Sequence, residues 1–70
     1  MRGKRFRLRF EIVGFELVRG NRESVTVPAG EVVTVLGAPR NGNQVIDVLW
    51  KRHPLVIFVD DLTRHCEEIV

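Results

Sequence analysis

Four side chains capable of chemistry lie close together near the C-terminal end of the chain. Asp60 and Asp61 are adjacent, and His65 is followed directly by Cys66. A carboxylate pair can bind a metal or act as acid and base. A histidine beside a cysteine can contribute to a zinc site or to a nucleophilic pair. Because the chain has one cysteine and two histidines, a zinc site with four ligands would need carboxylates or a second subunit.

The spacing of these residues favours structural roles. Leu62, Cys66 and Ile69 recur at i, i+4 and i+7, which predicts one apolar stripe on a short helix over 60–69. The aspartates then cap the start of that helix, and Cys66 packs in the core. Adjacent helical residues diverge by about 100°, so the thiol and the neighbouring imidazole would point apart. We therefore predict no catalytic residue, no cofactor and no metal, and we expect a protein that is not an enzyme.

Basic residues are concentrated at the N-terminus. Arg5, Arg7 and Arg9 alternate with apolar residues, so one strand would hold their side chains in a row, about 6.6 Å apart. This spacing is near that of successive phosphates, and the row is a candidate nucleic-acid-binding surface. Glu11 continues the same face, and the rest of the chain is net acidic. A solvated or protein-contacting strand face is the alternative interpretation.

The elements that position these side chains are predicted to be strands. Twelve valines and four isoleucines give the chain a strong β-branched bias. Apolar residues alternate with charged ones from Phe6 to Ile12, and Phe15 then falls out of phase. A β-bulge or sharp bend is therefore expected at Val13-Gly14.

Four further strands are expected, giving five in all. They are predicted over 24–27, 31–36, 45–50 and 55–59. Polar residues 19–22 form the first turn, Pro28 to Glu31 suits a type II turn with Gly30 at its third position, and Asn41-Gly42 signals a hairpin loop. Residues 51–54 are expected to connect the last two strands.

These elements predict a mostly β protein in one domain over 1–70. Its parts are a basic arm over 1–5, the strands of a barrel over 6–59 and the short terminal helix over 60–69. The single cysteine indicates a reducing compartment, and the longest apolar run, Leu55 to Val59, is far shorter than the roughly 20 residues of a membrane span. We expect a cytoplasmic protein with no export signal and no membrane contact.

The order of strands, turns and terminal helix resembles a five-stranded SH3-like barrel. The segments SVTVPAGEVVTVLG, VIDVLW and HPLVIFVDDLTRHCEE, within 24–68, are similar to a group of small single-domain bacterial proteins without an assigned activity. That group has a similar VPAG turn, a VLW strand and an aromatic residue before an Asp-Leu pair, matched here by Phe58 and Asp61-Leu62. The resemblance implies a fold and brings no catalytic residue with it.

A more distant likeness is to the plasmid-borne type II dihydrofolate reductases, which are tetramers of small SH3-like barrels. In that family a His-Pro turn precedes a strand that lines a shared pore, and here His53-Pro54 precedes a similar strand. Val56 stands where the family has its pore glutamine and Phe58 where it has its tyrosine, while Ile57 matches. The likeness implies barrels that associate, but the hydrogen-bonding groups for the reductase ligands are missing.

Two of the predicted strands are apolar on both faces. In Val45 to Trp50, Ile46 and Val48 lie on one face, while Val45 and Leu49 lie on the other. The strand over 55–59 is apolar throughout. A small barrel has only one interior, so the outward set must be covered by the helix, by the bent first strand or by another subunit.

We expect self-association to cover these outward apolar side chains, because a domain of this size gains little stability from one core. We predict a homo-oligomer, most simply a dimer, that uses Val45, Leu49, Val56 and Phe58. The protein would then act through self-association or by binding another macromolecule. A nucleic-acid-binding module that uses Arg5, Arg7 and Arg9 is the first alternative, and a small enzyme with a site between subunits is the second.

Overall fold

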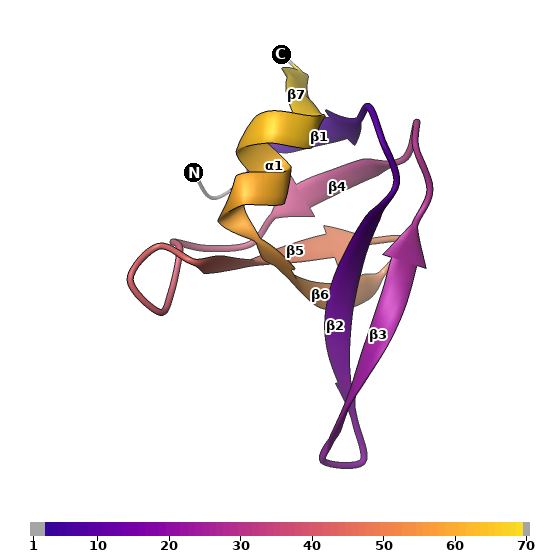
Figure 1. Ribbon diagram of the computed structural model, residues 1–70, viewed down its shortest axis with the longest axis vertical. Coiled ribbons are helices and arrows are strands. Elements are labelled where there is room, and N and C mark those ends of the chain that lie inside the picture. Colours follow the sequence, from indigo (N-terminus) through magenta and orange to yellow (C-terminus); the bar gives the residue numbers. More distant parts are fainter. Residues whose placement is uncertain (1–2, 70) are drawn as a thin grey trace.

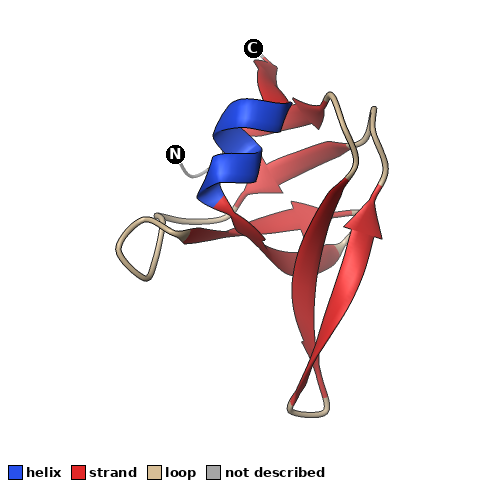
Figure 2. Ribbon diagram, viewed as in Figure 1, coloured by secondary structure: helices blue, strands red, loops and turns tan. Residues whose placement is uncertain are grey.

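A computed structural model describes residues 3–69, which form seven β-strands and one helix (Figures 1 and 2). The elements are β1 Arg5–Leu8, β2 Ile12–Val18, β3 Asn21–Val27, β4 Val32–Val35, β5 Val45–Trp50, β6 His53–Phe58, α1 Val59–His65 and β7 Cys66–Ile69. The mostly β prediction with one short helix is confirmed. Met1 and Arg2 of the predicted N-terminal arm lie outside the described residues, and Arg5 already belongs to β1.

The strands form one antiparallel sheet in the order β3-β2-β6-β5-β4-β1-β7. Within residues 3–69 the sheet is open, because β3 and β7 are edges that do not pair with each other. Figure 1 shows the β2–β3 hairpin crossing the other strands and projecting beyond them. The prediction of a five-stranded barrel was therefore wrong in strand number and in closure.

One extra strand arises because the first predicted strand is split. β1 ends at Leu8, the chain bends at Arg9 and Phe10, and β2 begins at Ile12. The two halves have different partners, since β1 pairs with β4 and β7 while β2 pairs with β3 and β6. The bend places Phe10 outside the core, 60% exposed, although its position continues the alternation that begins at Phe6.

The bulge predicted at Val13-Gly14 is absent from β2, where Gly14 pairs directly with Val25 of β3. Gly14 instead lets β2 approach β6 closely. A Cβ atom at this position would lie 3.1 Å from Ile57 Cγ2 and 3.3 Å from the Val56 carbonyl oxygen. The apolar residue out of phase is explained by the two faces of β2: Ile12 and Gly14 keep the inward positions of the alternation that begins at Phe6, and Phe15 points to the other face.

Two turns are tighter than the sequence suggested. Arg19 and Gly20 alone connect β2 to β3, and Lys51 and Arg52 alone connect β5 to β6. All four residues have positive φ, as a two-residue type I′ turn requires. β3 therefore begins at Asn21 and β6 at His53. The type II turn at Pro28 to Glu31 is confirmed, with Gly30 at φ 89° and a 3.4 Å hydrogen bond from the Glu31 N–H to the Pro28 carbonyl.

The helix is shorter than predicted. It begins at Val59, with Phe58 as its N-cap and no side-chain cap, so Asp60 and Asp61 lie in the first turn. It ends at His65, and the following residues form β7, in which Ile69 pairs with Arg5. The β1 edge supplies backbone partners that a longer helix could not have used. In residues 3–69 no helix is long and apolar enough to cross a membrane.

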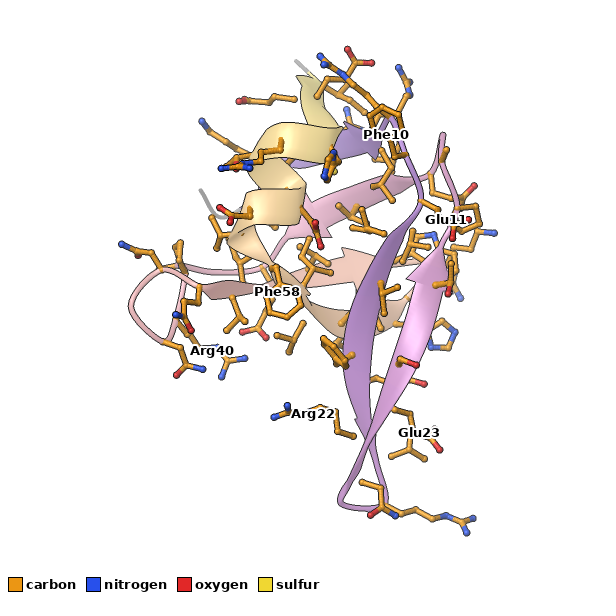
Figure 3. The ribbon with its side chains drawn as sticks, in the orientation of Figure 1. Phe10, Glu11, Arg22, Glu23, Arg40 and Phe58 are labelled. Carbon is orange, nitrogen blue, oxygen red and sulfur yellow. The ribbon has the colours of Figure 1, made fainter. Side chains whose placement is uncertain are left out.

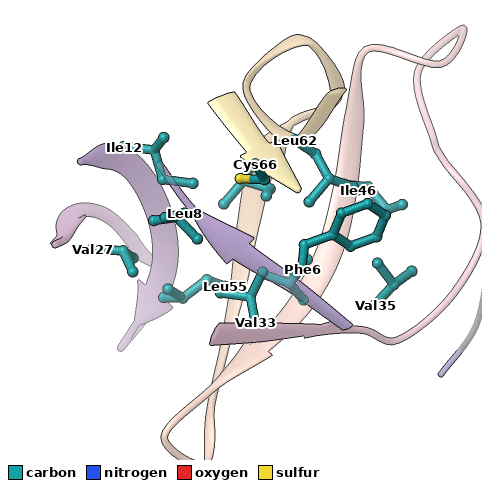
Figure 4. Close-up of a cluster of buried hydrophobic side chains, with 12 residues drawn as sticks. Phe6, Leu8, Ile12, Val27, Val33, Val35, Ile46, Leu55, Leu62 and Cys66 are labelled. Carbon is teal, nitrogen blue, oxygen red and sulfur yellow. The ribbon is translucent and has the colours of Figure 1, made fainter. Parts of the chain in front are cut away.

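A single cluster of buried side chains lies between the curled sheet and α1 (Figure 4). It contains Phe6, Leu8, Ile12, Val27, Val33, Val35, Ile46, Val48, Leu55, Ile57, Leu62 and Cys66. Leu62 is fully buried and is the only buried residue that α1 contributes. α1 covers the inner side of the sheet, and within residues 3–69 no helix covers the outer side.

Candidate protein-association surface

The four residues predicted for an oligomer interface lie together on the outer face of the sheet. In β5, Ile46 and Val48 point into the core, so Val45 and Leu49 point outward. In β6 the same alternation turns Val56 and Phe58 outward. Val45 lies directly opposite Phe58, whose side chain is 46% exposed.

Phe15 of β2 extends this surface. It pairs with Val56, and its ring meets the Phe58 ring edge to face, with centroids 5.9 Å apart and planes at 89°. Aromatic pairs prefer this arrangement. Phe15 was not among the predicted interface residues, but its apolar side chain at a position out of phase with Ile12 was the available signal. We call Phe15, Val45, Leu49, Val56 and Phe58 the outer patch.

A shallow groove of about 380 Å³ crosses the outer patch between the β2–β3 hairpin and the loop over 40–44. Phe15, Val45, Val56 and Phe58 line it, together with Glu16, Arg22, Arg40, Asn41 and Gln44. Leu49 does not line the groove; it faces Pro54 two residues farther along the same face.

Two arginines flank the groove. Figure 3 shows Arg22 on the hairpin and Arg40 on the loop, with side chains that point toward one another below Phe58. The Arg22 guanidinium lies 5.8 Å from the centre of the Phe15 ring, and Arg40 Nη2 donates to Asp47 Oδ1 at 2.8 Å. The patch therefore has an apolar floor and charged sides.

The predicted nucleic-acid residues do not form one straight row. Arg5 and Arg7 are exposed on β1, but Arg9 lies beyond the end of that strand, in the bend. Arg7 faces Glu67 across the β1–β7 pair, and Arg9 Nη2 lies 3.8 Å from a carboxylate oxygen of the same glutamate. Carboxylates of β7 are thus interspersed among these cations.

The remaining candidate chemistry is dispersed. Cys66 is buried in β7, and burial, with a smaller contribution from the Asp61 charge, raises the pKa of its thiol to about 11. The buried Nδ1 of His65 has no hydrogen-bond partner among the described groups, and Phe10 packs edge-on against the ring at 5.5 Å. Within residues 3–69 no group of three or more histidine, cysteine or carboxylate side chains is placed to hold a metal.

Comparison of the chain with protein-family models, curated proteins and solved structures finds no match.

Proposed function

We propose that this protein is a non-enzymatic module that self-associates through the outer patch. The observation that carries the proposal is the edge-to-face pair of Phe15 and Phe58 on a sheet face that α1 does not cover. Buried aromatic residues at the centre of an interface supply a large share of binding energy. A second copy would cover Phe58, which is exposed, and the half-buried apolar side chains around it.

The size of the chain is compatible with such an interface. A standard interface covers about 800 Å² on each partner. The chain exposes 4933 Å², so about one-sixth of its surface would be covered. We also infer a relationship to SH3-like barrels, supported by a strongly curled antiparallel sheet around one core, with open edges at β3 and β7 as the departure.

Light scattering coupled to size exclusion tests the proposal. At micromolar concentration we expect at least about twice the mass of one chain, as a two-fold dimer requires. Phe58→Ser should shift the protein toward the monomer, because it removes the centre of the patch. Phe10→Ser is the matched control, since Phe10 is also exposed but lies away from the outer patch.

Two results would contradict the proposal. One is a monomer whose melting temperature does not depend on protein concentration, because dissociating oligomers melt at temperatures that rise with concentration. The other is equal loss of assembly in the Phe10 and Phe58 variants, since assembly would then depend on overall exposed apolar surface and not on this face.

A further inference from the structure

Arg22 is a cation without a carboxylate partner. Lys4, Arg9, Arg40 and Lys51 each lie within 4.0 Å of a carboxylate oxygen, whereas among the described residues Arg22, like Arg5, Arg7, Arg19, Arg52 and Arg64, has no such neighbour. Arg22 differs from these other arginines in its position, because its guanidinium lies 5.8 Å from the centre of the Phe15 ring, beside the groove. An exposed arginine held beside an aromatic ring on an apolar face is a common feature of protein interfaces.

Asp47 lies on the opposite side of the groove and has an acceptor to spare. It is half-buried in β5, directly opposite Val56 of β6. Arg40 occupies Oδ1, and no hydrogen bond from residues 3–69 reaches Oδ2. A carboxylate can accept from both oxygens, so a second guanidinium can bind here.

The charges around the groove suit a second copy of the chain better than a partner that carries charge of only one sign. Arg22 and Arg40 lie at the groove together with the Asp47 carboxylate that Arg40 contacts. An acidic polymer would meet this carboxylate, and a basic one would meet two guanidinium groups. A copy of the same surface presents both signs, as a two-fold interface between identical patches requires.

The register of the strands shows how the two signs could meet. Phe15 pairs with Val56, and Val56 pairs with Asp47, so Val56 lies midway along this row. A two-fold axis that runs parallel to β6, in the plane of the interface above Val56, exchanges the two sides of the groove. It brings the hairpin side of one copy, with Arg22, over the β5 side of the other.

We propose that in the self-associated protein Arg22 of each subunit donates to the partner's Asp47, across a two-fold axis near Val56. This inference rests on the proposed function. The Phe15 and Phe58 rings then lie between two symmetric ion pairs. Partial burial strengthens such pairs, and charge complementarity fixes the orientation of the copies.

A charge exchange tests this arrangement. One variant is Arg22→Asp. The other combines Asp47→Arg with Arg40→Asp, so that the internal ion pair is kept with its signs reversed. Each variant alone faces like charges across the axis, and we expect its dimer Kd to rise at least about tenfold. In an equimolar mixture both contacts are again between opposite charges, and the mixed dimer should form within about threefold of the wild-type affinity.

Controls keep the outcomes distinct. Arg64→Asp changes an exposed charge on α1, away from the outer patch, and should leave the Kd unchanged. Wild-type-like dimers of both variants, or a mixture no stronger than its components, would overturn the ion pair while leaving self-association intact. A monomeric wild-type protein would overturn the proposed function and this inference together. Circular dichroism of each variant verifies folding before the affinities are compared.

Discussion

The indole Nε1 of Trp50 donates a 2.9 Å hydrogen bond to Glu31 Oε1, which joins the end of β5 to the residue just before β4. Lys51 Nζ lies 3.4 Å from the same oxygen and 5.4 Å from the centre of the indole ring. Trp50 is half-buried and packs against the core. A carboxylate, an ammonium group and an indole thus hold the β5–β6 turn against the sheet.

These contacts predict a pH-dependent contribution to stability. The hydrogen bond from Trp50, together with the Lys51 ammonium, lowers the pKa of Glu31 from its ordinary value of 4.5. The ionised form therefore stabilises the folded state above pH 4.5, and this contribution is lost as the pH falls through the lower folded-state pKa. Glu31→Gln keeps an acceptor for Trp50 but removes the charge. It should lower the urea midpoint at neutral pH, with the difference disappearing in acid; a pH-independent difference would contradict this.

Replacing Gly14 by alanine should cause a steric clash, and the same replacement at Gly37 serves as the control. A Cβ atom there meets Ile57 and the Val56 backbone at 3.1 and 3.3 Å, whereas one at Gly37 meets nothing within 4 Å. Gly14→Ala should destabilise the protein by about 1–3 kcal/mol, and Gly37→Ala should change stability by less than about 0.5 kcal/mol. Chemical denaturation measures both. Equal effects would show that β2 does not depend on close packing against β6.

Leu62 is predicted to hold α1 on the core. Its side chain is fully buried, so Leu62→Ala should cost about 2–5 kcal/mol in the free energy of unfolding. Arg64→Ala, on the exposed side of the same helix, should cost less than about 0.5 kcal/mol. If the Leu62 variant unfolds at the wild-type denaturant concentration, the helix is dispensable to the core.

The thiol of Cys66 is expected to be unreactive in the folded protein. Its pKa of about 11 leaves little thiolate at pH 8, and its burial blocks access. Alkylation by iodoacetamide at pH 8 should therefore be slow in buffer and fast in denaturant. Rapid labelling of the native protein would mean that β7 opens readily.

The arginine row predicts a defined salt dependence if it binds phosphates. The log of the affinity for duplex DNA should fall against the log of salt concentration by roughly 0.9 per phosphate contact. Because Glu67 lies among these cations, we expect no measurable binding even at about 50 mM salt. Binding that weakens when Arg7 is replaced by glutamine would reverse this expectation and support the nucleic-acid alternative.

Local patterns predicted the central strands well. β5 has its predicted bounds, because Ile46 and Val48 alternate with outward residues and turn residues precede the strand. The outward direction of Val45, Leu49, Val56 and Phe58 followed from the same alternation. These features depend on neighbours in the sequence.

The misplaced elements depend on distant partners. Phe10 continues the alternation from Phe6, so only the different partners of β1 and β2 reveal the bend. Cys66 and Ile69 fit a helical spacing, but pairing with β1 makes their segment a strand. The Lys51-Arg52 turn contains no glycine or asparagine, and so it lacked the usual hairpin signal. The groove combines residues from three separate segments, which no local pattern could have joined.

The position of β1 between β4 and β7 has a consequence for the order in which the chain folds. The hairpins β2–β3 and β5–β6 each close across two residues, whereas Arg5 must meet Ile69 from nearly the other end of the chain. Loop-closure entropy makes such distant pairing slower than local pairing. The hairpins should therefore form early, and β1 should be enclosed only after β7 has left the ribosome. Until then the backbone edge of β1 that β7 will pair with stays open to other strands. The nascent protein is therefore most exposed to misassembly at this end of the sheet, which lies opposite the β2–β3 hairpin.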